Sequence, residues 1–375
     1  MADRSMGRPG FAAAREATGL RAVRLEPSGV RPGRNVTAAG QLIPRPGVYE
    51  IYWRFAAERQ AVFERRVAGD PPPWTDDPIL RRFKFCCPYR AADRVSQYMI
   101  REVCYHSEPC TPEDRLFQIV AFRTFSRPPT WAAARAFLGR SPTLDDLASG
   151  RFTAALEHAR AANGGLYTAA FILCATNAYG QHAKHLNHVE LWRHMFVKDR
   201  LAARLLDAGT LRELFALLRG YPLMGDFMAY QTAIDIAYSD LTQAREDEFV
   251  VAGPGALRGI RKVFQGTGGL KPADVIRWMA DHQDEEFTRL GLRFSGLWGR
   301  PLQLIDCQGL FCEVDKYCRE AVPGLLSARS QIKARFTPAR EAIRLFFPPK
   351  WDINGLLPVA PVLGATGAAA GGTLF

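Results

Sequence analysis

Three aspartates follow a glycine turn near the middle of this 375-residue chain. The helical run LRELFALLRG precedes Gly225, the run MAYQTAIDIAY follows it, and carboxylates occur at Asp235, Asp240 and Asp247. A glycine turn between two helices can offer backbone amides to a DNA phosphate. A carboxylate beyond that turn can stabilise positive charge on a deoxyribose and orient a water molecule. We therefore expect a catalytic aspartate, Asp235 or Asp247 before Asp240, although aspartates that cap helices give the same pattern.

The second of these helices also carries side chains that could hold an extruded base. Tyr230 and Gln231 precede Asp235; a tyrosine can stack on a base and a glutamine can bind its edge. Further candidates for contact with the base lie in the segments RWMADHQDEEF and IDCQGLFCEVDKY, namely Gln283, Gln308 and Glu313. A half-buried helix whose polar atoms satisfy their neighbours would carry the same residue types.

Two basic segments could bind the phosphates. In residues 74–100, cations alternate with phenylalanine and tyrosine, as in sites that bind a distorted or single strand; these cations are Arg81, Arg82, Lys84, Arg90 and Arg94. In VVAGPGALRGIRK, glycines free the amides at the start of a basic helix; the residues concerned are Gly253, Gly255, Arg258, Arg261 and Lys262. The alternatives are a solvated helix face for the first segment and a glycine-rich linker for the second.

The composition permits a polyanionic partner. The formal charge is +11 and the isoelectric point is about 9.4, and arginine forks suit phosphates. GxxxxGK[ST] is absent, so we do not expect an ATP-driven kinase. The eight cysteines form no CxxC pair, and we expect reduced thiols, no metal and no cofactor. No signal peptide or membrane span is recognisable, and we expect a cytoplasmic protein.

The apolar spacing predicts an all-α protein. We expect a disordered basic arm at 1–44, a helical body at 45–355 that is possibly split into two lobes near residue 165, and a flexible tail at 356–375. Helical patterns cover 48–66, 92–106, 111–125, 130–138, 143–162, 188–206, 209–219, 226–239, 272–289 and 309–321. The segment GDPPPWTDDPIL is predicted to be a loop, and YTAAFILCAT is the best candidate for a strand.

Several long segments resemble the α-glutamyl/putrescinyl thymine pyrophosphorylase family, which is also seen as the helical domain beside hydroxymethyl-deoxyuridine DNA kinases. The resemblance covers about residues 46–352 and includes IYWRFAAERQAVFERR, MGDFMAYQTAIDIAYSD, FVVAGPGALRGIRK, HQDEEF, IDCQGLFCEVDKY and FPPKW. It implies an all-α fold related to helix-hairpin-helix DNA glycosylases. Phage members are implicated in thymine hypermodification, and some bacterial members look like defensive glycosylases that remove modified bases.

The helix-hairpin-helix likeness bears on two residues. In such glycosylases a carboxylate about twenty residues past the hairpin stabilises the sugar, and Asp247 lies 22 residues beyond Gly225. Members that form a Schiff base use a lysine two positions past the hairpin glycine, where this chain has Phe227. The likeness therefore implies that water is the nucleophile, with Phe227 beside the base.

We predict a monofunctional DNA glycosylase that extrudes and excises a hypermodified pyrimidine, such as a glucosylated hydroxymethyl base, from double-stranded phage DNA as antiviral defence. One alternative is a transferase or pyrophosphorylase in thymine hypermodification, for which the donor group would have to be made elsewhere. The other alternative is a non-catalytic reader of modified DNA. The sequence does not decide the base modification, the oligomeric state or the role of the basic arm.

Overall fold

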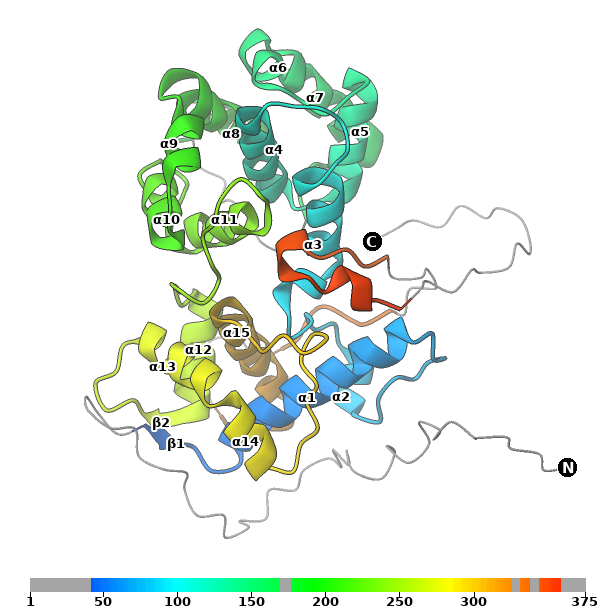
Figure 1. Ribbon diagram of the computed structural model, residues 1–375, viewed down its shortest axis with the longest axis vertical. Helices are drawn as coiled ribbons and strands as arrows, with labels where there is room; N and C mark the ends of the chain where they lie inside the picture. The colour runs from blue at the N-terminus through cyan, green and yellow to red at the C-terminus, as the bar shows by residue number, and fades with distance from the viewer. Residues whose placement is uncertain (1–41, 169–176, 326–330, 338–343, 359–375) are drawn as a thin grey trace, which may run out of the picture.

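The computed structural model describes residues 42–168, 177–325, 331–337 and 344–358. Within these ranges the chain is predominantly helical, which confirms the predicted all-α class. Figure 1 shows two groups of helices stacked along the long axis of the molecule. The predicted arm and tail lie mostly outside the described residues, as does nearly all of the strand candidate YTAAFILCAT.

The lower group in Figure 1 combines the start of the chain with its last third. Its elements are β1 (Ile43–Pro44), α1 (Val48–Val67), α2 (Pro78–Arg82), α12 (Pro254–Val263), β2 (Phe264–Gly266), α13 (Pro272–Asp281), α14 (Gln283–Arg289) and α15 (Leu304–Ala321). The two short strands pair antiparallel. Helix α1 buries Tyr52, Trp53 and Phe55, and Tyr52 lies 4.8 Å from Phe311 of α15 between ring centroids.

Helix α2 begins inside the segment that was predicted to be a loop. Asp77 caps it, because its Oδ1 accepts hydrogen bonds from the amides of Ile79 and Leu80 at 2.7 and 2.9 Å. Pro78 occupies the first helical position, where its missing N–H has no partner to lose. The run of prolines before residue 78 obscured this short helix in the sequence.

Helices α12 and α15 pack at close range through glycine. A Cβ added to Gly259 would lie 2.0 Å from the carbonyl oxygen of Phe311, and one added to Gly255 would lie 2.3 Å from Sγ of Cys312. Both positions therefore need glycine for the approach of the two helices, whatever else they do.

The upper group in Figure 1 holds the middle of the chain. Its helices are α4 (Pro112–Phe125), α5 (Pro128–Leu138), α6 (Leu144–Ser149), α7 (Arg151–Asn163), α8 (Lys184–Trp192), α9 (Leu201–Asp207), α10 (Leu211–Arg219) and α11 (Asp226–Tyr238), with a π-helical turn, η4 (Arg193–Lys198), after α8. Helix α3 (Arg94–Met99) and the π-helical turn η3 (Ile100–Cys104) lead into this group. The short 3-10 turns are η2 (Arg90–Ala92), η5 (Pro349–Trp351) and η6 (Asn354–Leu356).

A single aromatic core spans the point near residue 165 where we expected a possible division. Phe117 of α4 contacts Phe152 of α7, with ring centroids 5.4 Å apart, and Trp192 of α8 at 6.3 Å. Helices α7 and α8 flank residue 165, so the chain does not pass between the two groups there. It passes instead between α2 and α3, and again between α11 and α12.

The hairpin of α10 and α11 forms as the sequence predicted. Thr210 and Glu213 cap the start of α10 reciprocally. Gly225 caps α11 with a φ of −64°, and the positive φ in this turn, +70°, belongs to Leu223. Among the helices of the described ranges, none is both long enough and apolar enough to cross a bilayer.

Candidate functional site

Asp235 lies at the centre of a buried charge cluster. Its side chain has no exposed surface, and its Oδ1 accepts a hydrogen bond from Nη2 of Arg90 at 2.6 Å. Its Oδ2 accepts another from Nε of Arg123, which comes from α4. This carboxylate therefore joins α11 to two segments that are distant in sequence. Its predicted catalytic role stays a prediction.

The other two candidate acids lie on the surface, outside this buried cluster. The Asp247 side chain is 43% exposed and pairs with Arg245, which lowers the pKa of Asp247. Asp240 is exposed after the end of α11. The structure thus does not bring the three aspartates together.

The predicted base-binding residues of α11 are packed rather than open. Tyr230 is fully buried, and its hydroxyl donates to the carbonyl of Phe249 at 3.4 Å. The Gln231 side-chain oxygen accepts from Nε of Arg90 at 2.8 Å. Phe227 is half-buried and lies against Gly253.

The later base-binding candidates also have partners within the protein. Gln283 donates to the carbonyl of Leu302 at 3.1 Å and accepts from its amide at 2.7 Å. Glu313 accepts from the Cys86 amide at 2.9 Å. Gln308 is buried where α15 faces the start of α12. In this conformation Gln283 and Glu313 fix helices and loops to one another, and the role of the three residues at a base stays a prediction.

The basic helix α12 is largely neutralised by Asp315 of α15. Asp315 lies 3.0 Å from Nε of Arg258 and 3.1 Å from Nζ of Lys262, and it also binds Arg319 at 2.7 Å. Arg261 is exposed. The glycines before this helix, Gly253 and Gly255, are buried, whereas Gly225 of the hairpin is exposed with open space around it. Contact of these residues with phosphate stays a prediction.

A pair of buried carboxyl groups lies where the two groups of helices meet. Asp306, at the start of α15, accepts from the backbone amide of Arg90 at 2.8 Å, and Glu246 binds Arg300 at 2.6 Å. Burial, together with the negative charge of Glu246, raises the pKa of Asp306 to about 7. Burial also raises the pKa of Glu246, against the opposing effect of Arg300. The guanidinium of Arg300 in turn lies 4.1 Å from the ring of Trp351.

Four of the five cations predicted between residues 74 and 100 are exposed, and we call this set the basic face. None of the four is paired with a carboxylate in the described ranges; they are Arg81, Arg82, Lys84 and Arg94. Arg90 differs from them, because its guanidinium points inward to Asp235. The interleaved Phe83, Phe85 and Tyr89 are all buried.

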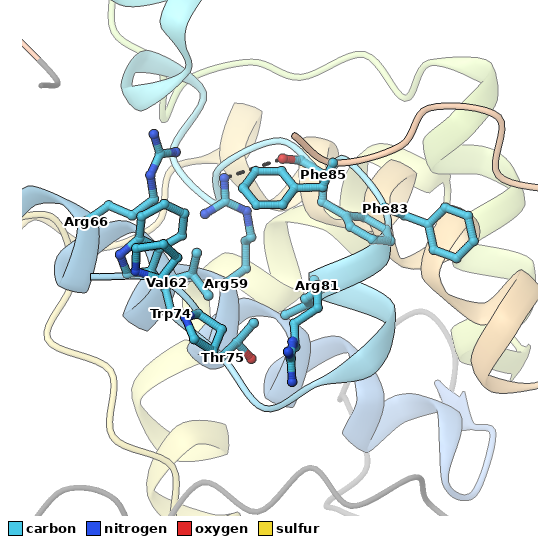
Figure 2. Close-up of a pocket in the computed structure, with 12 residues that line it drawn as sticks. Arg59, Val62, Arg66, Trp74, Thr75, Arg81, Phe83 and Phe85 are labelled. Carbon is cyan, nitrogen blue, oxygen red and sulfur yellow. Dashed lines mark hydrogen bonds between the residues drawn. The ribbon is translucent and has the colours of Figure 1, made fainter. Parts of the chain in front are cut away.

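A pocket of about 340 Å³ opens beside this basic face. It lies between the C-terminal half of α1, the loop before α2, and α2 itself, and Figure 2 shows the side chains that project from these elements. Its walls combine arginine and aromatic residues without a carboxylate; the residues are Arg59, Val62, Arg66, Pro72, Pro73, Trp74, Thr75, Leu80, Arg81, Phe83, Phe85 and Phe336.

Sequence reasoning missed most of this pocket, but one pattern pointed to it. Arg59, Val62 and Arg66 are spaced three and four residues apart, which puts them on one face of α1. We predicted that segment only as a helix. Phe336 could not have been found, because its position against Trp74, with ring centroids 6.3 Å apart, depends on the tertiary fold.

The comparison with protein families identifies the helical body. Residues 46–327 match the family described as "5-hmdU DNA kinase, helical domain". The chain belongs to this family. It is 27% identical over 287 residues to a 5-hmdU DNA kinase of Bacillus phage SP10. The aligned region covers 72% of this chain but only 45% of that kinase, so the chain spans less than half the length of this relative. No solved structure matches the chain.

This family membership confirms the helical-domain part of the predicted resemblance and corrects the predicted enzyme class. The named relative is a DNA kinase, which is a transferase. The prediction of a monofunctional hydrolytic DNA glycosylase is therefore wrong. The likeness to helix-hairpin-helix glycosylases suggested hydrolysis by Asp235 or Asp247, but a hairpin followed by aspartates is compatible with many functions.

Proposed function

We propose that this chain binds DNA that carries 5-hydroxymethylated pyrimidines, and that its basic face is the surface that contacts the phosphates. The observation that carries the proposal is the set of exposed cations without acid partners on that face, namely Arg81, Arg82, Lys84 and Arg94. The name of the phage relative supports the choice of DNA and of the modified base, and the net charge of +11 is consistent with a polyanionic partner.

These cations suit DNA better than the basic helix α12 does, because two cations of α12 are already bound to a carboxylate. Arg258 and Lys262 are already bound to Asp315, so a phosphate would have to displace that carboxylate. Arg81 and Arg94 have no such competitor in the described ranges. Each unpaired cation that meets a phosphate releases a condensed counterion, which gives binding that weakens as salt rises.

Fluorescence anisotropy of labelled DNA at several salt concentrations tests the proposal. The full chain should bind a duplex containing 5-hydroxymethyluracil, and bind it more tightly than the same duplex containing thymine. Changing all four cations of the basic face to glutamine should reduce the slope of log K against log salt by about 3 to 4.

The matched control changes four exposed cations of the upper group of helices to glutamine, namely Arg160, Lys198, Arg204 and Arg212. This variant has the same net charge as the first one, and its salt slope should stay near that of the parent. Absence of binding to either duplex would contradict the proposal, and so would an equal loss of slope in the two variants.

A second candidate function is group transfer at the modified base, and the buried carboxyl pair favours it. A carboxyl with a pKa near neutrality, as at Asp306, can accept a proton from an incoming nucleophile and return it. This candidate requires the two groups of helices to separate enough for a base to reach Asp306. A reader of modified DNA would bind without any such reaction.

Mass spectrometry of nucleosides from modified DNA incubated with the protein and candidate donors distinguishes transfer from binding alone. Transfer predicts a base of altered mass, and the Asp306→Asn variant should lose that product while its DNA affinity is kept. Binding alone predicts unchanged nucleosides with the parent protein.

A further inference from the structure

The pocket between α1 and α2 has the composition of a nucleotide site. We propose that it receives one unpaired nucleotide of a DNA strand, with the base against Trp74 and the adjoining phosphate on Arg59 and Arg66. This inference rests on the proposed function and identifies the part of the DNA that binds beside the basic face. In Figure 2 the guanidinium groups of Arg59 and Arg66 project from α1 on the same side as the Trp74 ring.

Among the described residues, no carboxylate lines the pocket. The Nη1 atom of Arg59 is buried without a hydrogen-bond partner, while Nη2 reaches the carbonyl of Phe85 at 3.4 Å. Burial and the positive charges of Arg94 and Arg59 lower the pKa of Arg66. A bound phosphate would relieve this repulsion and supply an acceptor for Nη1 of Arg59.

The carboxylates around the pocket are bound to other groups. Asp93, whose negative charge interacts with Arg59, accepts a hydrogen bond from the Cys87 amide at 2.8 Å. Glu58 binds Arg65 at 3.3 Å and also contacts Thr75. Asp77 caps α2 and accepts a hydrogen bond from Tyr317 at 2.6 Å. Glu58 and Asp77 hold the floor of the pocket in place, so they do not neutralise Arg59 or Arg66.

Trp74 provides the surface for a base. Its indole N–H donates to the carbonyl of Asp70 at 2.6 Å, which fixes the ring. The Arg66 guanidinium lies 4.9 Å from the ring centroid on one face, and Phe336 approaches edge-on. A base that stacks on tryptophan beside an arginine is the arrangement used for sequence-tolerant binding of unpaired nucleotides.

The size of the pocket limits its occupant to a small part of a strand. Its volume of about 340 Å³ is at the lower end of the range of roughly 300–1,000 Å³ for sites that bind small molecules. A base paired within a duplex cannot reach such a recess, because its faces are covered by its neighbours. The occupant is therefore a nucleotide that is already unpaired or has left the stack.

Three DNA hairpins that differ at one position test the assignment with the full chain. The first is fully paired, the second has one bulged thymidine, and the third has a bulged abasic residue in its place. The bulged thymidine should bind about tenfold more tightly than the other two. This gain in affinity should disappear in Trp74→Ala and persist largely in Trp74→Phe. The control Phe137→Ala, which removes an exposed ring in the upper group of helices, should keep it fully.

The phosphate half of the site is tested by Arg66→Gln, with Arg204→Gln as the control on an exposed arginine of α9. Arg66→Gln should lower the affinity for the bulged hairpin more than the affinity for the paired one. Arg204→Gln should change neither affinity. Equal affinity for all three hairpins would overturn the pocket assignment while leaving DNA binding intact. Failure to bind any hairpin would also overturn the pocket assignment, while the 5-hydroxymethyluracil duplex decides the proposed function separately. Preference for a phosphoserine peptide over the bulged hairpin would overturn the nucleotide as occupant.

Discussion

Replacing Asp235 by asparagine is expected to lower the free energy of unfolding by about 3–5 kcal/mol, the usual cost of removing one partner from a buried ion pair. The side chains of Arg90 and Arg123 are only 11% and 4% exposed, and Asp235 has no exposed surface. The substitution removes an anion that these two guanidinium groups share. It also places an amide N–H₂ donor where one guanidinium donates, so the loss is not confined to charge.

Urea unfolding of the full chain measures this change, with Asp247→Asn as the matched control. Asp247 pairs with Arg245 at the surface, so its substitution should change the free energy of unfolding too little to detect. Adding Arg123→Gln to Asp235→Asn removes one of the two cations that Asp235 binds, so the double variant should recover part of the lost stability. Partial recovery would identify a buried charge imbalance as the cause, because the second substitution reduces that imbalance.

An unchanged unfolding free energy in Asp235→Asn would refute this reasoning. If that variant also lost an activity on DNA, Asp235 would have to act in chemistry rather than in holding α11 to its neighbours. If Asp247→Asn were the more destabilised of the two, the burial of the Asp235 cluster itself would be in doubt.

Two further perturbations test other parts of the fold. Because the folded chain keeps the proton on Asp306 up to about pH 7, while an unfolded aspartate releases it near pH 4, the stability that this group contributes falls as pH rises through that window. Urea unfolding at several pH values should show a smaller fall in Asp306→Asn. Gly259→Ala should destabilise the chain by about 3 kcal/mol or more, because its Cβ would meet the backbone of α15. Gly309→Ala, with open space around it, should be neutral or stabilising by up to about 1 kcal/mol in a thermal melt.

The helical architecture was predictable because its determinants are local. Apolar residues three and four apart indicated α1 and α4. The Thr210–Glu213 capping box at the start of α10 is a local signal of the same kind. The passage of the chain between the two groups of helices was not predictable. It depends on which apolar faces meet, and the contacts of Phe117 with α7 and α8 are set by the tertiary structure.

The meaning of individual glycines was harder to predict than their positions. Gly253 and Gly255 suggested an anion cradle because glycine frees backbone amides at a helix start. In the structure Gly255 and Gly259 are four residues apart on the face of α12 that meets α15. A glycine pattern of this kind is compatible with close helix packing and with anion binding. Only the position of the neighbouring helix distinguishes these two interpretations.

The site residues show the same limit more sharply, because the partner of a charge decides what that charge can do. Asp235 looked like an available acid, yet its partners Arg90 and Arg123 lie 145 and 112 residues away in sequence. Arg90 looked like part of a phosphate-binding run, and it is the member that turns inward. Arg59 and Arg66 drew no attention, and they are the arginines for which the fold provides a recess without an acid. The availability of a charge, rather than its residue type, therefore locates the surface on which a polyanion can bind.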